Sequence, residues 1–279
     1  MWVLVNLLVM VGMLVVVPGG LRLLDDSGLA LARRVWPYGA AGAVCLWLPR
    51  GPVATGFAVI YAVAAGVLCA YAARFSNRGW RAQIAWVTAL VSPGVAASAL
   101  VAERAGYALF GFEPGVLALT VAHFHFAGFA AALIAGLHRQ ISPGRWADAA
   151  ALTVPAGTML VLLGYFTGEF VELAGALVLT AGMWTVGWLT WTHARSGRYD
   201  RLTAALLGTS AVVLAASMVL AVSWALGEAT GIPHPSLAWM AATHGVANAL
   251  GFAVCGIAGW RRVRDRQGAG TVLSVSATS

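Results

Sequence analysis

Two apolar stretches of the chain carry side chains that can exchange protons. Residues 121–129 read VAHFHFAGF and contain His123 and His125. Residues 242–252 read ATHGVANALGF and contain His244 and Asn248, which share one face of a helix because they lie four residues apart. An imidazole titrates near neutral pH and is the commonest general acid or base. The three histidines are therefore candidate catalytic residues, and Asn248 is a candidate substrate-binding residue.

A pair of carboxylates supplies a second candidate group. Residues 165–175 read YFTGEFVELAG, in which Glu169 and Glu172 share a helical face because they lie three residues apart. Acidic side chains in a first helical turn also stabilise the positive end of the helix dipole, which is a structural explanation for Glu169. Glu172 lies deeper and is the candidate catalytic acid or base. Glu169 and Tyr165 are candidate substrate-binding residues.

The spacing of His123 and His125 limits what this pair can do. Two residues correspond to about 200° around a helix, so the rings face nearly opposite ways and cannot bind one metal ion from an ideal helix. One ring can then face a cavity while the other bonds a neighbouring helix. A functional role for at least one of them and packing roles for both are open alternatives, and the same holds for His244.

The composition places these residues in lipid. Of 279 residues, 60% are hydrophobic and 10% are charged, and the mean hydropathy is +0.82. A soluble domain carries about 25% charged residues, so this chain has too few to cover a surface in water. We predict an all-α integral membrane protein of the cell membrane. The lipid bilayer is its expected partner, nucleic acid is not, and the sequence identifies no protein partner.

Nine apolar segments approach or exceed the roughly 20 residues that cross a bilayer. They are 2–18, 35–49, 53–73, 83–102, 115–137, 149–167, 169–192, 202–226 and 236–260. The segment 35–49 is the shortest. The sixth and seventh segments touch, so a tight turn at Thr167 and Gly168 must separate them. The sequence predicts a single bundle of nine transmembrane helices.

The arginines predict the orientation of this bundle. One set of alternate loops holds 15 of the 17 arginines, and the other set holds only Arg50 and Arg104. The first set comprises Arg22, Arg33, Arg34, Arg74, Arg78, Arg81, Arg139, Arg145, Arg195, Arg198, Arg201, Arg261, Arg262, Arg264 and Arg266. Cytoplasmic loops are enriched in Arg and Lys, so the N-terminus is expected outside and the C-terminus in the cytoplasm. Residues 1–260 form the transmembrane domain, and 261–279 form a short polar cytoplasmic tail.

In this orientation the polar side chains of the spans gather toward the outer surface. At about 1.5 Å per residue, the histidines of the two motifs lie roughly 12–15 Å below that surface. Asn6 lies in the outer third of the first segment and is a further candidate substrate-binding residue. His138 and His193 lie beside arginines at cytoplasmic ends and are expected to be interfacial.

Several motifs of known chemistry are absent. The chain has no GxxxxGK[ST], GxSxG or HExxH and no paired Asp-rich motif, which disfavours nucleotide hydrolysis and diphosphate ionisation. Cys45, Cys69 and Cys255 lie in apolar runs without CxxC spacing and are expected to be small core residues. We predict no cofactor and no metal site. Haem or a single metal ion is a less favoured alternative, because several more buried histidines would be needed.

The stretches HFHFAGF and THGVANALGF together resemble the YndJ-like family of bacterial membrane proteins. The two motifs lie about 120 residues apart in one polytopic domain. The resemblance implies that His123, His125, His244 and Asn248 belong to one functional unit. The family is often labelled a transporter, and the resemblance implies no mechanism.

Intramembrane acid–base catalysis is the first functional hypothesis. The enzyme would cyclise, isomerise or open the epoxide of a lipophilic small molecule in a His/Glu pocket that opens to the outer leaflet. Glu172 would donate a proton, and His123 or His244 would accept one. Asn248 would hold an oxygen atom of the substrate.

A multi-pass transporter or proton-coupled carrier is the alternative hypothesis. It would use the same His and Glu side chains as a relay, with polar residues continuing to the cytoplasm. Broken helices would also help, and Pro93 and Pro155 are the interior candidates. The one-sided polarity favours the enzyme. A haem- or metal-binding membrane protein is a third alternative.

Overall fold

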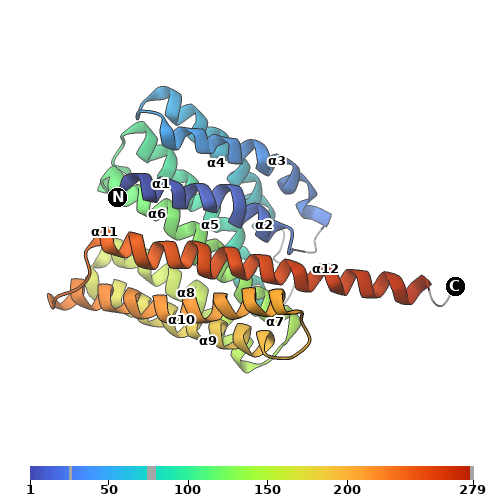
Figure 1. The fold of residues 1–279 in the computed structure, drawn as a ribbon. Helices are drawn as coiled ribbons and strands as arrows, with labels where there is room; N and C mark the ends of the chain where they lie inside the picture. The colour runs from blue at the N-terminus through green and yellow to red at the C-terminus, as the bar shows by residue number, and fades with distance from the viewer. Residues whose placement is uncertain (25–26, 74–79, 277–279) are drawn as a thin grey trace.

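The computed structural model describes residues 1–24, 27–73 and 80–276, and every regular element within them is a helix (Figure 1). The first part contains α1 (Trp2–Val11), η1 (Gly12–Val16), α2 (Val17–Leu21), η2 (Ser27–Leu29), α3 (Ala30–Ala41), η3 (Gly42–Trp47), α4 (Pro52–Ala72), α5 (Trp80–Ala105) and η5 (Leu109–Gly111). The second part contains α6 (Pro114–His123), η6 (Phe124–Ala130), α7 (Ala131–Ile141), α8 (Arg145–Thr167), α9 (Glu169–Ala194), α10 (Arg201–Thr230), α11 (Leu237–Met240), η7 (Ala241–Gly245), η8 (Ala247–Val254) and α12 (Cys255–Ser276). Four of these elements, η1, η6, η7 and η8, are π-helical.

Eight helical runs among the described residues are long and apolar enough to cross a membrane. They are Trp2–Leu21, Pro52–Ala72, Gln83–Ala105, Pro114–Ile141, Arg145–Thr167, Glu169–Ala194, Arg201–Thr230 and Leu237–Arg266. The predicted all-α architecture is confirmed, and these runs make the chain a multi-pass membrane protein.

The predicted segment 35–49 is not among these eight runs. It begins within α3, which has only 12 residues and contains the polar pair Arg33 and Arg34, and it continues as the 3-10 helix η3. The segment nevertheless packs along α4. A methyl group added at Gly42 would lie 2.6 Å from the carbonyl oxygen of Phe57, so the two helices touch through their backbones.

The turn predicted between the sixth and seventh segments is confirmed. Gly168 separates α8 from α9 with a φ of 132°, a backbone conformation that favours glycine. The antiparallel helices then pack closely, because a methyl group added at Gly164 would lie 2.5 Å from Cα of Glu172. The turn thus places Glu172 directly against α8.

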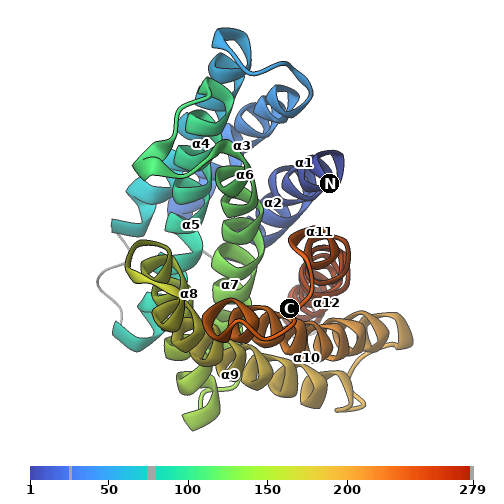
Figure 2. The same cartoon turned by 90° about the vertical axis from the view of Figure 1, so that its left-hand side faces the viewer.

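The run α6–η6–α7 forms the centre of the bundle. With 72% of its apolar window buried, it is the most buried of the eight runs in the described part of the chain. Figure 2 shows α6 and α7 between the group α3, α4 and α5 and the group α9, α10 and α12. This central run carries three of the six histidines, namely His123, His125 and His138.

The two ends of the chain lie at opposite ends of the bundle (Figure 1). α12 runs past the domain boundary predicted at residue 260 and continues as a helix to Ser276. The last three residues of the predicted tail, 277–279, lie outside the described residues. So do Arg74 and Arg78 of the arginine-rich set.

The two arginines of the sparse set pair with one carboxylate where α5 ends. Glu103 and Arg104 are 1% and 7% exposed, and Glu103 pairs with both Arg104 and the exposed Arg50. Arg104 also donates to the carbonyl of Cys45 at 3.0 Å, which anchors η3 to α5. The buried charge of Arg104 is therefore neutralised inside the fold, and Arg50 contacts the pair from the surface.

Candidate functional site

Three π-helical segments from distant parts of the chain meet inside the bundle. η1, η6 and η8 contact one another, and η7 precedes η8 in the same run. A widened turn disturbs the regular backbone hydrogen bonds, and in lipid a side chain has to satisfy the freed carbonyls. Trp36 donates to the carbonyl of Met13 in η1 at 2.9 Å, and Ser210 donates to the carbonyl of Phe252 in η8 at 2.9 Å. Because π-helical turns frequently occur at functional sites, this meeting point is the candidate site.

His244 lies in η7 and is held by α10. Its Nδ1 donates to the carbonyl oxygen of Ser217 at 2.8 Å, so the neutral ring keeps Nε2 as its proton-accepting atom. The Nδ2 atom of Asn248 lies 3.1 Å from that Nε2 and 3.0 Å from the carbonyl oxygen of His244. The hydroxyl of Ser217 donates to Oδ1 of Asn248 at 2.9 Å. The three side chains therefore form one hydrogen-bonded cluster between α10 and the π-helical run.

His123 is the last residue of α6 and lies near this cluster. Its Nε2 is buried without a hydrogen-bond partner among the described residues, and its ring lies within electrostatic range of His244. α1 contacts both α6 and η7, and a methyl group added at Gly245 would lie 3.2 Å from Leu8. The structure thus brings His123 and His244 together beside α1, as the two motifs predict. A buried imidazole nitrogen with no partner is able to bond a substrate atom or a water molecule.

His125 points to a different part of the bundle. It is fully buried, its Nδ1 donates to the carbonyl of Val121 at 2.7 Å, and its Nε2 lies 2.9 Å from the hydroxyl of Tyr61. A methyl group added at Gly12 would lie 2.5 Å from Cγ of His125, so η1 packs on this ring. Both ring nitrogens are satisfied, and the ring links η6 to α4 and η1. The two neighbouring histidines have different partners, as their spacing predicts.

Glu172 belongs to a second cluster at the ends of α8, α9 and α10. Its half-buried carboxyl interacts electrostatically with Glu228 and Glu169, and the hydroxyl of Tyr165 interacts with Glu172 and Glu228. Nε2 of His234 lies 3.2 Å from Oε1 of Glu228. Tyr165 and Glu169 are exposed. The two predicted carboxylates and Tyr165 are therefore neighbours, as the stretch YFTGEFVELAG suggests.

The two clusters lie at different depths. Ser217 and Glu228 are 11 residues apart on α10, which corresponds to about 16 Å along the helix. Across the described ranges, no hydrogen bond or ion pair joins Glu172 to His123, His125 or His244. The structure therefore does not place Glu172 in the pocket with the histidines that the sequence led us to expect.

Asn6, another predicted site residue, makes its hydrogen bond outside both clusters. Its Nδ2 donates to the carbonyl oxygen of Leu46 at 2.8 Å. This bond joins α1 to the last turn of η3 and uses the amide to satisfy a helix end.

A third cluster was missed by the sequence analysis. His138 was expected to be interfacial, but it is fully buried, and its Nε2 lies 2.8 Å from the hydroxyl of Thr190. The rings of His138, His193 and Trp260 lie 5.0–5.3 Å apart, centroid to centroid. The only sequence signal was the position of these histidines near arginines at one end of the bundle. His138 directly precedes Arg139, and His193 lies two residues before Arg195. Ser217 had no sequence signal at all.

The described residues offer no clear metal centre. Within them, no group of three or more His, Cys, Asp or Glu side chains is arranged to hold a metal ion.

One comparison with known proteins gives a family. The model of a family described as YndJ-like protein matches residues 7–252, which include both histidine motifs and all three clusters except Trp260. No curated protein and no solved structure matches the chain significantly.

Proposed function

This chain belongs to the YndJ-like family, and we propose that it is a membrane enzyme that performs acid–base chemistry on a lipophilic small molecule. The observation that carries the proposal is the pair of partly buried imidazoles in the bundle interior. His244 is oriented by the Ser217 carbonyl, and the Nε2 of His123 has no partner in the described structure. Oriented and unused imidazole nitrogens in an apolar interior are what proton transfer to a bound substrate requires.

The hydrogen bonds suggest a role for each residue. Nε2 of His244 accepts a proton from a substrate carbon or hydroxyl, because its Nδ1 is already committed as a donor to Ser217. His123 delivers a proton to the substrate atom that gains charge, so an isomerisation or cyclisation leaves the proton count unchanged. When the substrate binds, the amide of Asn248 transfers its hydrogen bond from Nε2 of His244 to a substrate oxygen, which leaves that Nε2 free to accept the proton.

The carboxylate cluster is assigned a separate role. Glu228 lies about 16 Å from Ser217 along α10, which is too far for direct proton transfer to the histidine cluster, and Glu172 on α9 interacts with Glu228. We assign them to the entrance of the site, where they exchange protons with the exterior. Glu169 and Tyr165 are exposed beside them and are suited to meet an entering substrate.

The proposed orientation places the N-terminus outside, with α3–η3 counted as a ninth crossing. Three features support it: the split of 15 arginines against two, the pairing of those two with the buried Glu103, and the position of the chain ends at opposite ends of the bundle (Figure 1).

Product analysis in the native host tests the enzyme. Lipid extracts from cells that express the wild-type chain are compared by mass spectrometry with extracts from His244→Gln and His123→Gln cells. We expect one apolar product to fall at least about 100-fold in both variants, the usual scale for a lost acid or base. Tyr38→Phe, at a tyrosine that is 74% exposed and lies outside the three clusters, serves as the control and keeps the product. Extracts that do not differ among the four strains, at equal protein levels, would contradict the enzyme.

A proton-coupled carrier is the second candidate, and the buried His138 favours it. Titratable groups now occur at three depths: Glu172 at one end, His123 and His244 in the interior, and His138 with His193 at the other end. A carrier in proteoliposomes would acidify or alkalinise the lumen when its substrate gradient is applied, and His138→Gln would abolish this change. An enzyme without transport would leave the lumenal pH unchanged.

A further inference from the structure

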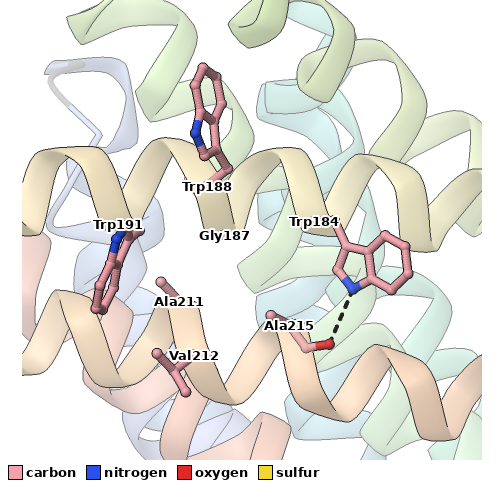
Figure 3. A pocket seen from close by; sticks show the side chains of 7 residues that line it. All are labelled: Trp184, Gly187, Trp188, Trp191, Ala211, Val212 and Ala215. Carbon is pink, nitrogen blue, oxygen red and sulfur yellow. Dashed lines mark hydrogen bonds between the residues drawn. The ribbon is translucent and has the colours of Figure 1, made fainter.

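A groove between α9 and α10 lies apart from the three polar clusters. It has a volume of about 450 Å³ and is lined by Trp184, Gly187, Trp188, Trp191, Ala211, Val212 and Ala215. In Figure 3, Trp184 and Trp191 point toward α10 on either side of Gly187, and Trp188 rises from α9 away from α10. Trp184 and Trp188 are 48% and 50% exposed, so these rings face the bilayer.

The tryptophans of the groove reach unusually deep into the span. Tryptophan is enriched at membrane interfaces, but Trp184 lies ten residues before Ala194, roughly 15 Å from that helix end. Its indole nitrogen donates to the carbonyl oxygen of Ala215 at 3.1 Å (Figure 3). Because this polar atom is satisfied by the protein, the ring presents an apolar wall. Gly187 has no side chain and leaves room for a guest between the walls.

The shallow end of the groove is cationic. Cζ of Arg195 lies 5.5 Å from the ring centroid of Trp191. Cζ of Arg145 lies 4.8 Å from the ring centroid of Trp146, and that ring makes an edge-to-face contact with Trp188 at 6.0 Å. Neither guanidinium has a carboxylate partner among the described residues. Both are held by aromatic rings beside the groove and keep their donors for an anion.

We propose that this groove binds an anionic phospholipid from the leaflet at the arginine-rich end of the bundle. An acyl chain lies between Trp184, Trp191 and Ala215, and the phosphate contacts Arg145 and Arg195. Charge complementarity decides the occupant, because two unpaired guanidinium groups favour a phosphate and disfavour an uncharged guest or a second copy with the same charges. Each arginine near the membrane surface is worth about a fivefold preference for anionic lipid.

Fluorescence quenching by brominated lipids tests the proposal. The purified chain is reconstituted in phosphatidylcholine vesicles that contain either brominated phosphatidylglycerol or brominated phosphatidylcholine. We expect the phosphatidylglycerol to displace phosphatidylcholine from the tryptophans with at least about fivefold preference. Arg145→Gln combined with Arg195→Gln removes the preference. Arg22→Gln, at the same end of the bundle but directly after α2, is the matched control and keeps the preference.

Two results would overturn the groove as a lipid site. One is equal quenching by both brominated lipids, which means ordinary boundary lipid. The other is a preference that survives in the double arginine variant. Trp184→Phe and Trp191→Phe in one chain identify the reporting rings, since the phosphatidylglycerol-specific part of the quenching must fall in that variant. If that part is unchanged, the preference arises elsewhere and the proposal is wrong.

Discussion

Nδ1 of His244 lies 2.8 Å from the main-chain carbonyl oxygen of Ser217, which joins a π-helical turn to the straight helix α10. A main-chain acceptor fixes the ring without adding a second titratable group. The hydroxyl of Ser217 is used differently, because it donates to Asn248. The backbone and the side chain of one residue thus position two of the candidate site residues.

Because the carbonyl of Ser217 bonds His244 and its hydroxyl bonds Asn248, Ser217→Ala and His244→Gln should have different effects. The alanine variant keeps the carbonyl that holds His244 and loses the hydroxyl contacts to Asn248 and to the Leu214 carbonyl, so we expect activity within about tenfold of wild type. The glutamine variant loses the titrating group, and we expect a loss of at least about 100-fold. Product yield per folded chain in lipid extracts measures both. Equal losses in the two variants would mean that Asn248 carries the chemistry.

Tyr61→Phe tests whether His125 has a structural role. The change removes the hydroxyl that lies 2.9 Å from Nε2 of His125 and leaves that buried nitrogen without its partner. We expect the free energy of unfolding in detergent to fall by about 0.6–2 kcal/mol, the scale of a membrane hydrogen bond. Activity per folded chain should not change. Normal stability with lost activity would instead place His125 in the reaction.

Much of the fold could be predicted because hydropathy and arginine positions are strong one-dimensional signals. The apolar runs of α4 to α10 and the glycine turn at Gly168 follow directly from the printed letters. The segment 35–49 was less predictable, since Arg33 and Arg34 lower its hydropathy while its packing on α4 keeps it helical. Packing of this kind depends on a partner helix, so the sequence of the segment alone does not predict it.

The candidate site could be predicted only in part. Histidines in apolar runs are visible in any sequence, and the association of His123 with His244 was expected from their motifs. The widened turns were not, because whether a turn is α- or π-helical depends on neighbours such as Trp36 and Ser210, which bond the displaced carbonyls. The role of Ser217 could not be predicted either, because it depends on which face of α10 contacts η7.

Gly12→Ala tests the packing of η1 on the central run α6–η6–α7. The added methyl group would lie 2.5 Å from Cγ of His125, and neither the buried ring nor η1 has room to move. We expect overpacking to lower the free energy of unfolding by about 1–3 kcal/mol. Gly66→Ala in α4 is the matched control, because no heavy atom lies within 4 Å of its added methyl group. If both variants melt alike in detergent, η1 does not pack on His125 as described.

Asp200 predicts a pH dependence outside the membrane spans. Hydrogen bonds from Thr203, and then the guanidinium groups of Arg262 and Arg266, hold the pKa of this carboxyl well below its usual value. A lowered folded-state pKa means that the stabilisation is complete above the unfolded pKa, near 3.9, and is lost as the pH falls below it. Asp200→Asn should therefore flatten the fall in melting temperature between about pH 5 and 3. Asp265→Asn, at an exposed aspartate of α12, should keep the wild-type profile.

Reporter fusions test the proposed orientation and the ninth crossing together. A reporter after Arg266 should be cytoplasmic and a tag before Met1 external, because the arginine-rich ends of the helices stay in the cytoplasm. The count depends on α3–η3, so a cysteine introduced at Ser27 should be protected from an external reagent and one at Pro49 should react. If Ser27 and Pro49 label from the same side, α3–η3 does not cross. The chain then has eight crossings, both termini share one side, and the depth assigned to His123 and His244 is measured from the wrong surface.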